Sequence, residues 1–471
     1  MSIAIKHDAA RRNFLGWSAR AAGLRAAAPF ARNLAALGAG APFALNLAAL
    51  GAASAQTASD YKALVCIFLY GGNDNHNTVI PYDAASYNGY QQARGGIARA
   101  RNTLLPLTPL TSQGGREFAL PPELQPLATL FSAGRAAIVA NVGPLVRPTT
   151  RAQYQNRSVP LPPKLFSHND QQSVWQASVP EGAVYGWGGR IGDVLGSANA
   201  KSTFTSISIA GNAVWASGQS TLQYQVGPGG AVAVNALANA SLFGSPNASQ
   251  LLRRLVTEPR THVLQNDHTR LIQRGLTANQ DLREAMAGMP DLQTVFPEGG
   301  LAAQLKMAAR IIAARNGIGA RRQVIFVSLG GFDHHAFLSG SHPPLLTQLA
   351  ASLNAFDAAL GELNVRNQVT TFTASDFGRS LASNGDGSDH GWGSHHFVVG
   401  GAVKGRDIYG QFPVVAFGTN EDSGQGRLIP TTSVDQYAAS FARWMGLSDT
   451  QLADVLPNLQ YFSPSTLPMF V

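Results

Sequence analysis

The sequence has a single cysteine among its 471 residues, so it cannot form an intramolecular disulfide. Cys66 lies in the apolar run at residues 63–70, where a small buried side chain is favoured over a nucleophile. Charged residues make up only 13% of the sequence and hydrophobic residues 45%, which indicates a globular protein. No segment after residue 55 is apolar enough to span a bilayer, so we expect no membrane span in the mature chain.

The net charge of +8 is concentrated at the N-terminus. Residues 1–55 contain six basic residues and one acidic residue, so this segment carries +5 and the remainder only +3. The high isoelectric point therefore belongs mainly to the leader and is poor evidence for a nucleic-acid partner. We expect none.

The leader has the features of an export signal. Arg11 and Arg12 form a twin-arginine pattern, an alanine- and leucine-rich stretch follows, and residues 53–55 form an Ala-Ser-Ala cleavage pattern. The alternative is an N-terminal amphipathic or membrane-spanning helix, which Arg32 and two prolines interrupt. We predict that residues 1–55 are removed, that the twin-arginine translocase is a partner during export, and that the protein is periplasmic or secreted.

Residues 56–471 read as a single α/β domain. Continuous apolar runs alternate with helical patterns, which predicts a mostly parallel central sheet covered by helices on both faces. A loop-rich and helical insertion is expected around residues 200–300. The predicted strands are residues 63–70, 136–141, 324–329, 369–373, 397–401 and 414–417; the predicted helices are residues 121–135, 249–289, 301–316, 345–363, 434–445 and 449–455.

Chemistry-bearing residues gather after these strands. Six of the 11 histidines lie between His334 and His396. Asp74, Asp333 and Asp376 each fall just beyond the end of a predicted strand. Because the carboxyl ends of parallel strands meet at one edge of a sheet, we expect these segments to converge there.

Carboxylates and imidazoles together suit a divalent cation, with zinc, manganese, magnesium and calcium all open. Asp333 and His335 share one side of an extended segment, and His390 lies in a glycine-rich loop. Asp residues also occur in turns for purely local reasons, so Asp74 alone is ambiguous. The predicted metal ligands are Asp74, Asp333, His335, Asp376 and His390.

Three further residues are candidate catalytic groups. Ser167 precedes Asp170 by three residues, which fits both a helix cap and a nucleophile at a helix N-terminus. His168 could be a base, a ligand or a structural residue. Arg379 could hold a tetrahedral anion, or simply form an ion pair with an aspartate.

The motifs together resemble the bacterial exported family called domain of unknown function 1501, over essentially all of residues 60–465. The segments that carry the resemblance are Gly-Gly-Asn-Asp at 71–74, Phe-Ser-His-Asn-Asp at 166–170, Gly-Gly-Phe-Asp-His-His at 330–335, Ser-Asp-Phe-Gly-Arg at 375–379 and Asp-His-Gly-Trp-Gly at 389–393. The resemblance implies an alkaline phosphatase-like and sulfatase-like α/β/α sandwich with a metal site at one edge. It also implies that Ser167 is the nucleophile.

Two departures from the phosphatase pattern bear on the metal site. Phosphatase-type members place the paired Asp and His further apart than positions 333 and 335, and they have a histidine where this chain has Phe377. We therefore expect one metal position to be weakened, rebuilt with His395 or His396, or lost.

The favoured function is an exported, metal-dependent hydrolase of small-molecule or polymeric phosphate or sulfate esters. The alternative is a non-catalytic exported binding or assembly protein with the same fold. A serine esterase ranks last, because no Gly-x-Ser-x-Gly motif surrounds Ser167.

Overall fold

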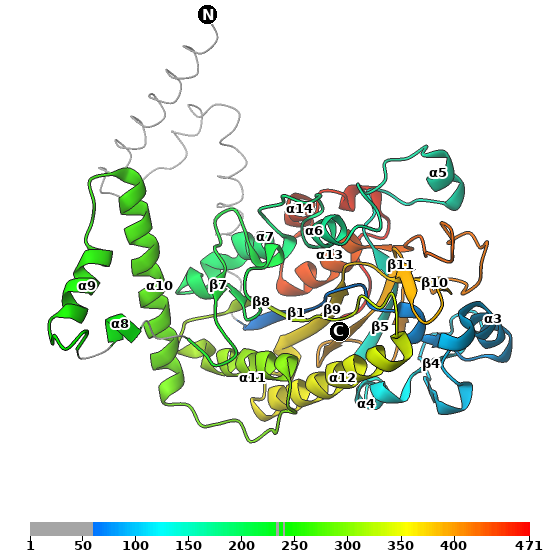
Figure 1. Cartoon of the computed structure of the whole chain (residues 1–471), viewed down its shortest axis with the longest axis horizontal. Coiled ribbons are helices and arrows are strands. Elements are labelled where there is room, and N and C mark those ends of the chain that lie inside the picture. The colour runs from blue at the N-terminus through cyan, green and yellow to red at the C-terminus, as the bar shows by residue number, and fades with distance from the viewer. Residues whose placement is uncertain (1–59, 232–234, 239–240) are drawn as a thin grey trace, which may run out of the picture. The chain divides into compact units, whose positions relative to one another are not determined.

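The computed structural model describes residues 60–231, 235–238 and 241–471, and the predicted export signal at residues 1–55 lies outside the described residues. The described residues contain a nine-stranded sheet in the order β13-β5-β12-β9-β1-β8-β6-β7, with β14 also paired to β5 (Figure 1). The strands are β1 (Lys62–Leu69), β5 (Ala136–Gly143), β6 (Ser206–Ser208), β7 (Tyr224–Gln225), β8 (Arg322–Leu329), β9 (Val369–Ser375), β12 (Ser394–Gly400), β13 (Ile408–Tyr409) and β14 (Thr432–Ser433).

The sheet is mixed and mostly parallel, which confirms the predicted fold class. β1 lies between β8 and β9 and is parallel to both. Only β12 runs against its neighbours, being antiparallel to β5 and to β9. The three central strands therefore deliver their carboxyl ends to the same edge of the sheet.

Alternate residues of β1 face two separate apolar layers, as a strand buried on both faces requires. Val65 and Ile67 pack with one layer of helices, whereas Cys66 and Phe68 pack with the other. Burial raises the pKa of the Cys66 thiol, in agreement with the interpretation of this residue as a core side chain. The first layer contains α4 (Gln125–Ser132), α11 (Gly300–Ala313) and α12 (Leu338–Glu362); the second contains α6 (His168–Ala177), α7 (Trp187–Leu195), α13 (Val434–Met445) and α14 (Asp449–Val455) (Figure 1).

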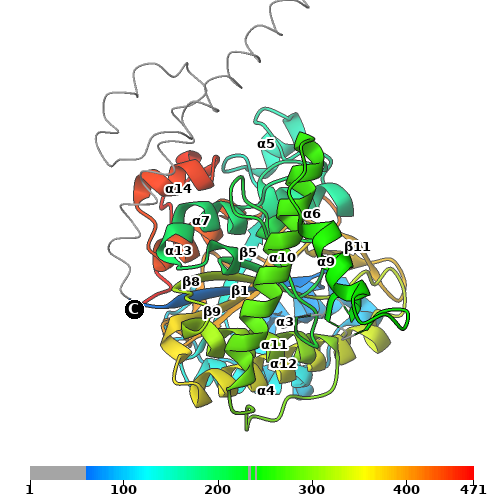
Figure 2. The ribbon, with the colours of Figure 1, turned by 90° about the vertical axis from the view of Figure 1, so that its left-hand side faces the viewer.

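A helical segment is inserted between β7 and α11. It comprises α8 (Asn235–Ala238), α9 (Ala248–Thr257) and α10 (Val263–Ala287), and α9 and α10 lie side by side in both Figure 1 and Figure 2. None of the helices in the described part of the chain is long and apolar enough to cross a membrane. The remaining elements are α3 (Ala84–Arg94), α5 (Arg151–Asn156), a small sheet of β2 (Ile80–Pro81), β3 (Leu105–Pro106) and β4 (Phe118–Leu120), and the pair β10 (Arg379–Ser383) and β11 (Ser388–His390).

Three predicted elements differ in the structure. The single helix expected at 249–289 is two helices, Ala248–Thr257 and Val263–Ala287, because Glu258 before Pro259 takes an extended conformation that ends the first. The strand expected at 414–417 is absent from the described residues, because Val414 and Phe417 are exposed and pair with no strand. The helix expected to start at residue 345 starts at Leu338 and includes Pro343 and Pro344. Leu338 and His342 are buried, so tertiary packing holds this segment in the helix despite the two missing N–H donors.

Asp435, in the first turn of α13, gives a prediction about stability. It is buried, and its Oδ1 accepts a hydrogen bond from the Asn458 backbone N–H at 3.2 Å. Burial raises the pKa of Asp435 from 3.8 to about 6, despite that bond and the nearby charge of Arg190. The folded state therefore keeps this proton more tightly than the unfolded chain does. The stability that it contributes is complete below about pH 4 and is lost as the pH rises through about 6.

Asp435→Asn is expected to remove this dependence. Between pH 4 and pH 7, the free energy of unfolding of the unchanged protein should fall relative to that of Asp435→Asn by about 3 kcal/mol, since each pKa unit is worth about 1.4 kcal/mol. Urea unfolding of both proteins across this pH range measures the difference. A difference that stays constant with pH would contradict the prediction.

Candidate functional site

The loops that follow β1, β8 and β9 meet at one edge of the sheet, as the sequence predicted. Asp376 Oδ2 accepts a hydrogen bond from the Gly71 N–H at 3.1 Å. Arg379 Nη1 donates to the Gly71 carbonyl at 3.2 Å and to Asp333 Oδ1 at 2.7 Å. Segments separated by some 300 positions in the chain are thus joined at the same point.

His168 is oriented by the buried carboxylate of Asp376. Its Nδ1 lies 2.7 Å from Asp376 Oδ2, which also accepts a 2.7 Å hydrogen bond from Gln172 Nε2. The hydrogen bond to Asp376 raises the pKa of His168. Because Nδ1 donates to the carboxylate, Nε2 of a neutral His168 carries a lone pair, and this buried atom has no hydrogen-bond partner among the described residues.

His390 is fixed in the same way by a backbone carbonyl. Its Nδ1 lies 2.7 Å from the carbonyl oxygen of Phe166, which can only accept, so Nδ1 must donate. Burial lowers the pKa of His390, which favours the neutral imidazole. Nε2 of His390 therefore also presents a lone pair, and Asp333 Oδ1 lies 3.4 Å away from it.

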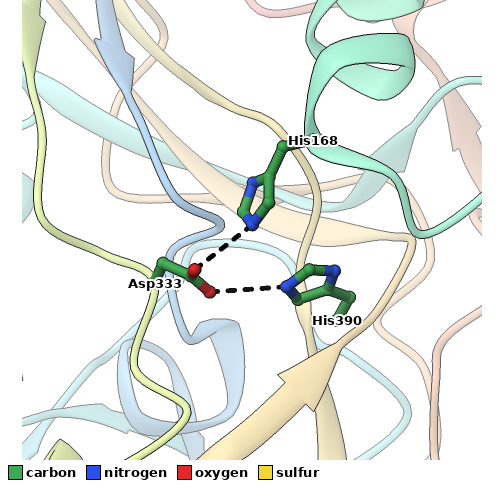
Figure 3. Close-up of side chains that lie close together, drawn as sticks. All are labelled: His168, Asp333 and His390. Carbon is green, nitrogen blue, oxygen red and sulfur yellow. Dashed lines mark ion pairs between the residues drawn. The ribbon is translucent and has the colours of Figure 1, made fainter.

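His168, Asp333 and His390 converge from three separate elements (Figure 3). His168 Nε2 lies 3.4 Å from Asp333 Oδ2, and one ligand atom from each of the three residues lies within 4.8 Å of the others. Ligands about 2.0–2.1 Å from a tetrahedral cation are themselves about 3.3 Å apart. Two oriented imidazole lone pairs and one carboxylate at this spacing fit a divalent cation.

His335 lies at the exposed side of this group. Its Nε2 is 2.8 Å from His390 Nε2 and 3.2 Å from Asp333 Oδ1, and its Nδ1 is 3.4 Å from Asp389. Since His390 Nε2 holds a lone pair, the short contact requires that His335 Nε2 carries the proton. His335 therefore either donates a hydrogen bond to His390 or gives up that proton and becomes a fourth ligand.

Arg379 is fully buried, and four of its five N–H donors are used within the described part of the chain. They bond to Asp333, the Gly71 carbonyl and the hydroxyl and carbonyl of Ser388. Partial burial raises the pKa of Asp333, but the hydrogen bond and charge of Arg379 outweigh it and leave the pKa below its ordinary value. Of its two predicted roles, the geometry matches the Asp–Arg ion pair, with Asp333 as the partner.

Asp74 lies outside the three-residue group. It is fully buried in an ion pair with Arg94, and its Oδ1 accepts the His76 backbone N–H at 3.2 Å. His76 is itself buried, and burial together with the charge of Arg94 lowers its pKa to about 3. The positive charge of Arg94 therefore balances the negative charge of Asp74 within the protein.

Ser167 occupies the N-cap position of α6, as both of its predicted roles require. Its hydroxyl donates to Asp170 Oδ2 at 2.9 Å instead of capping a backbone N–H. Asp170 is buried, and Lys164 lies 3.4 Å from its other oxygen. The side chain that accepts the hydrogen bond of the Ser167 hydroxyl is therefore Asp170, not His168.

Phe377 occupies the position at which the phosphatase pattern has a histidine. Its ring is buried and lies against His168 and His390, with ring centroids 4.8 Å and 4.6 Å apart. Gly72 makes room for it, since a Cβ at that position would come within 2.4 Å of the ring. An apolar ring thus fills space beside the three-residue group where the pattern would have placed a further imidazole.

His395 and His396 are buried within β12 and lie away from this group. His395 accepts the Asn141 N–H and stacks on Phe412, whereas His396 Nδ1 lies 3.3 Å from the Thr373 hydroxyl. Burial lowers the pKa of both to about 3. Their neighbours are core residues on the two faces of the sheet, which gives neither imidazole a path to the site.

Sequence reasoning missed the groups that orient the site. Phe166 supplies the carbonyl for His390 from a left-handed backbone conformation with φ of 74°, which is rare for a bulky residue. Arg427 stacks on the Phe166 ring and donates to the His390 carbonyl at 2.7 Å. Of these groups, only Gln172 could have been found from the sequence, because it lies one helical turn after His168 and so shares its face of the helix.

The chain belongs to the family described as "Protein of unknown function (DUF1501)", whose model matches residues 61–456. The family predicted from the motifs is therefore confirmed. No curated protein sequence matches the chain.

The chain is also distantly similar to several solved structures. The PsFucS1 sulfatase from Pseudoalteromonas sp. is 10% identical, with 89% of this chain and 74% of that chain covered and a TM-score of 0.35. The lipoteichoic acid synthase LtaP from Listeria monocytogenes is 9% identical, with 86% and 78% covered and a TM-score of 0.32. A Bacteroides thetaiotaomicron structure from work on the metabolism of multiple glycosaminoglycans is 9% identical, with 84% and 75% covered and a TM-score of 0.35.

The orientation of His168 gives a prediction for metal affinity. Asp376→Asn weakens the acceptor that fixes the His168 tautomer, so affinity for Zn²⁺ should fall about 10- to 100-fold. Isothermal titration of the purified protein measures it. Ser167→Ala is the matched control and should keep the affinity of the unchanged protein, because its hydroxyl bonds only to Asp170. Equal affinity in Asp376→Asn would contradict the orienting role.

The buried pair of Asp74 and Arg94 gives a prediction for stability. Arg94→Met should lower the free energy of unfolding by about 3–5 kcal/mol, because it leaves the Asp74 charge buried without its partner. Adding Asp74→Asn to Arg94→Met should restore part of the loss. Urea unfolding in the presence of a chelator measures both. A single variant as stable as the unchanged protein would show that Asp74 is neutralised by some other group.

Proposed function

We propose that this protein is an exported hydrolase of phosphate or sulfate esters that depends on a divalent cation. The observation that carries the proposal is the convergence of His168, Asp333 and His390, with both imidazoles held in the tautomer that a ligand needs. Export by the twin-arginine translocase, and a periplasmic or secreted location, rest on the sequence of residues 1–55.

The donor set favours zinc among the cations considered. Two imidazoles and one carboxylate suit zinc or manganese better than magnesium or calcium, which prefer oxygen ligands. Phe377 beside His168 and His390 supports a single cation position. Asp74 and Asp376 then serve as buried supporting carboxylates and not as direct ligands.

When bound, a divalent cation would polarise an ester oxygen and stabilise negative charge that develops on it. The chain's own residues supply orientation and proton transfer. Arg379 holds Asp333 in place, and Asp376 and the Phe166 carbonyl hold the two imidazoles. His335 is half exposed, and in its doubly protonated form it is placed to donate the Nε2 proton to a leaving oxygen and become a neutral imidazole.

Ser167 is the proposed nucleophile, with Asp170 as its proton acceptor. A hydroxyl hydrogen-bonded to a buried carboxylate at a helix N-terminus has the pairing that nucleophilic catalysis uses. Attack of Oγ on phosphorus or sulfur would pass the hydroxyl proton to Asp170 and release the alcohol, protonated by His335. Water would then attack the serine ester and return a proton to His335, while the proton on Asp170 returns to Ser167 Oγ as phosphate or sulfate leaves.

The rival function is a non-catalytic exported binding or assembly protein. Two observations favour it. Arg379 is fully buried and uses four of its five N–H donors within the described residues, and the Ser167–Asp170 bond satisfies both side chains locally without any substrate. The two functions differ in whether the metal-loaded protein turns over any ester.

Hydrolysis of p-nitrophenyl phosphate and p-nitrophenyl sulfate by the Zn²⁺-loaded protein tests the proposal. Ser167→Ala should lower kcat/KM by at least ~100-fold while circular dichroism and Zn²⁺ affinity remain unchanged, because only the nucleophile is lost. Ser167→Ala with full activity would remove the serine from the mechanism. A metal-loaded, folded protein without turnover of phosphate, phosphonate or sulfate esters would establish the non-catalytic alternative.

A further inference from the structure

The pair of helices α9 and α10 carries an unusual amount of exposed apolar surface. Five of its leucine and valine side chains are more than half exposed, and Phe243 in the preceding turn is 98% exposed. Contiguous exposed apolar surface on a soluble protein marks an interaction site. The exposed side chains on the helices are Leu251, Leu255, Val263, Leu264 and Leu271.

These side chains follow helical spacing. Leu251 and Leu255 are four residues apart on α9, and Leu264 and Leu271 are seven apart on α10, so each pair shares one face of its helix. Between the helices runs a groove of about 560 Å³ lined by Leu255, Val256, Leu264 and Ile272 together with Arg260, His262 and His268. The pair therefore presents leucines and basic side chains on the same surface.

The other end of α10 is firmly anchored. Ala278 and Leu282 are buried in the main core layer, and Ala285 and Met286 pack against it. The exposed Leu264 and Leu271 lie in the N-terminal half of the same helix. The packed C-terminal half of α10 thus keeps its exposed N-terminal half away from the core.

The charge of this segment is matched to an anionic surface. Residues 248–274 contain five arginines and two acidic residues, a net of +3, which equals the whole net charge of residues 56–471. Arg253 is exposed and has no ion-pair partner among the described residues, whereas Arg254 pairs with Glu258 on the surface. Positive charge is therefore concentrated beside the leucines.

We propose that the face formed by α9 and the N-terminal half of α10 docks on a membrane surface containing anionic lipids. Leucine with arginine, and a single phenylalanine at an exposed turn, is the composition of an amphipathic helix that lies in the headgroup region. Protein interface cores are instead enriched in aromatic residues, and α9 and this half of α10 have none. The proposal is independent of the proposed hydrolase activity.

Co-sedimentation with vesicles tests the proposal. The purified protein should pellet with vesicles of phosphatidylcholine and phosphatidylglycerol in a ratio of about 3:1, and bind pure phosphatidylcholine at least ~10-fold more weakly. Leu251→Gln combined with Leu255→Gln and Leu264→Gln should reduce binding to the mixed vesicles at least ~10-fold. Arg253→Gln should reduce binding to the mixed vesicles about fivefold. At high salt the effect of this substitution should be smaller, because salt screens the charge of Arg253.

Val295→Gln is the matched control, because Val295 is an exposed apolar residue outside this face and its replacement should leave binding unchanged. All proteins compared differ only at the substituted positions, so any binding by residues outside the described part of the chain is common to them. Circular dichroism checks that the surface variants fold. Equal binding of the triple variant, or equal binding to both kinds of vesicle, would overturn the proposal. So would a dimer in sedimentation analysis that the triple variant loses, with no vesicle binding, because the face would then bind a second copy.

Discussion

The hydrogen bond between His168 and the buried carboxylate of Asp376 is the contact on which the candidate site depends. It joins the start of α6 to the end of β9, and the same carboxylate oxygen also accepts the Gly71 N–H from the loop after β1. One oxygen therefore aligns three segments of the chain. Because it accepts the Nδ1 proton, it leaves the opposite nitrogen of His168 facing Asp333.

Buried charge is handled in a consistent way around this edge of the sheet. Asp333 is held by Arg379 and Asp74 by Arg94, so each of these two carboxylates is paired with a guanidinium. The two pairs differ in exposure: Asp74 and Arg94 are fully buried, whereas Asp333 keeps an exposed side. Asp333 is therefore the carboxylate that remains available to a cation, and Asp74 is the one that the fold has neutralised.

Much of the architecture could be predicted from periodicity. The run at residues 63–70 alternates between two apolar layers and so became the central strand, and the acidic residues that follow β1, β8 and β9 meet because these strands are parallel neighbours. The partner of each side chain could not be predicted in the same way. The sequence leaves Arg379 open between holding a substrate anion and pairing with an aspartate, because its bonds to Asp333 and Gly71 depend on a loop path that no local pattern encodes.

The sequence by itself determined the family, the fold class and the edge of the sheet at which the chemistry gathers, because strand periodicity and motif spacing are local properties of the chain. Only the tertiary structure decided that His168 joins Asp333 and His390, that Asp74 is held by Arg94, and that the Phe377 ring fills the neighbouring space. These outcomes depend on which side chains from distant segments meet, and on which polar groups are buried away from water. The pattern of burial across the whole fold decides both, because every buried polar group needs a hydrogen-bond partner.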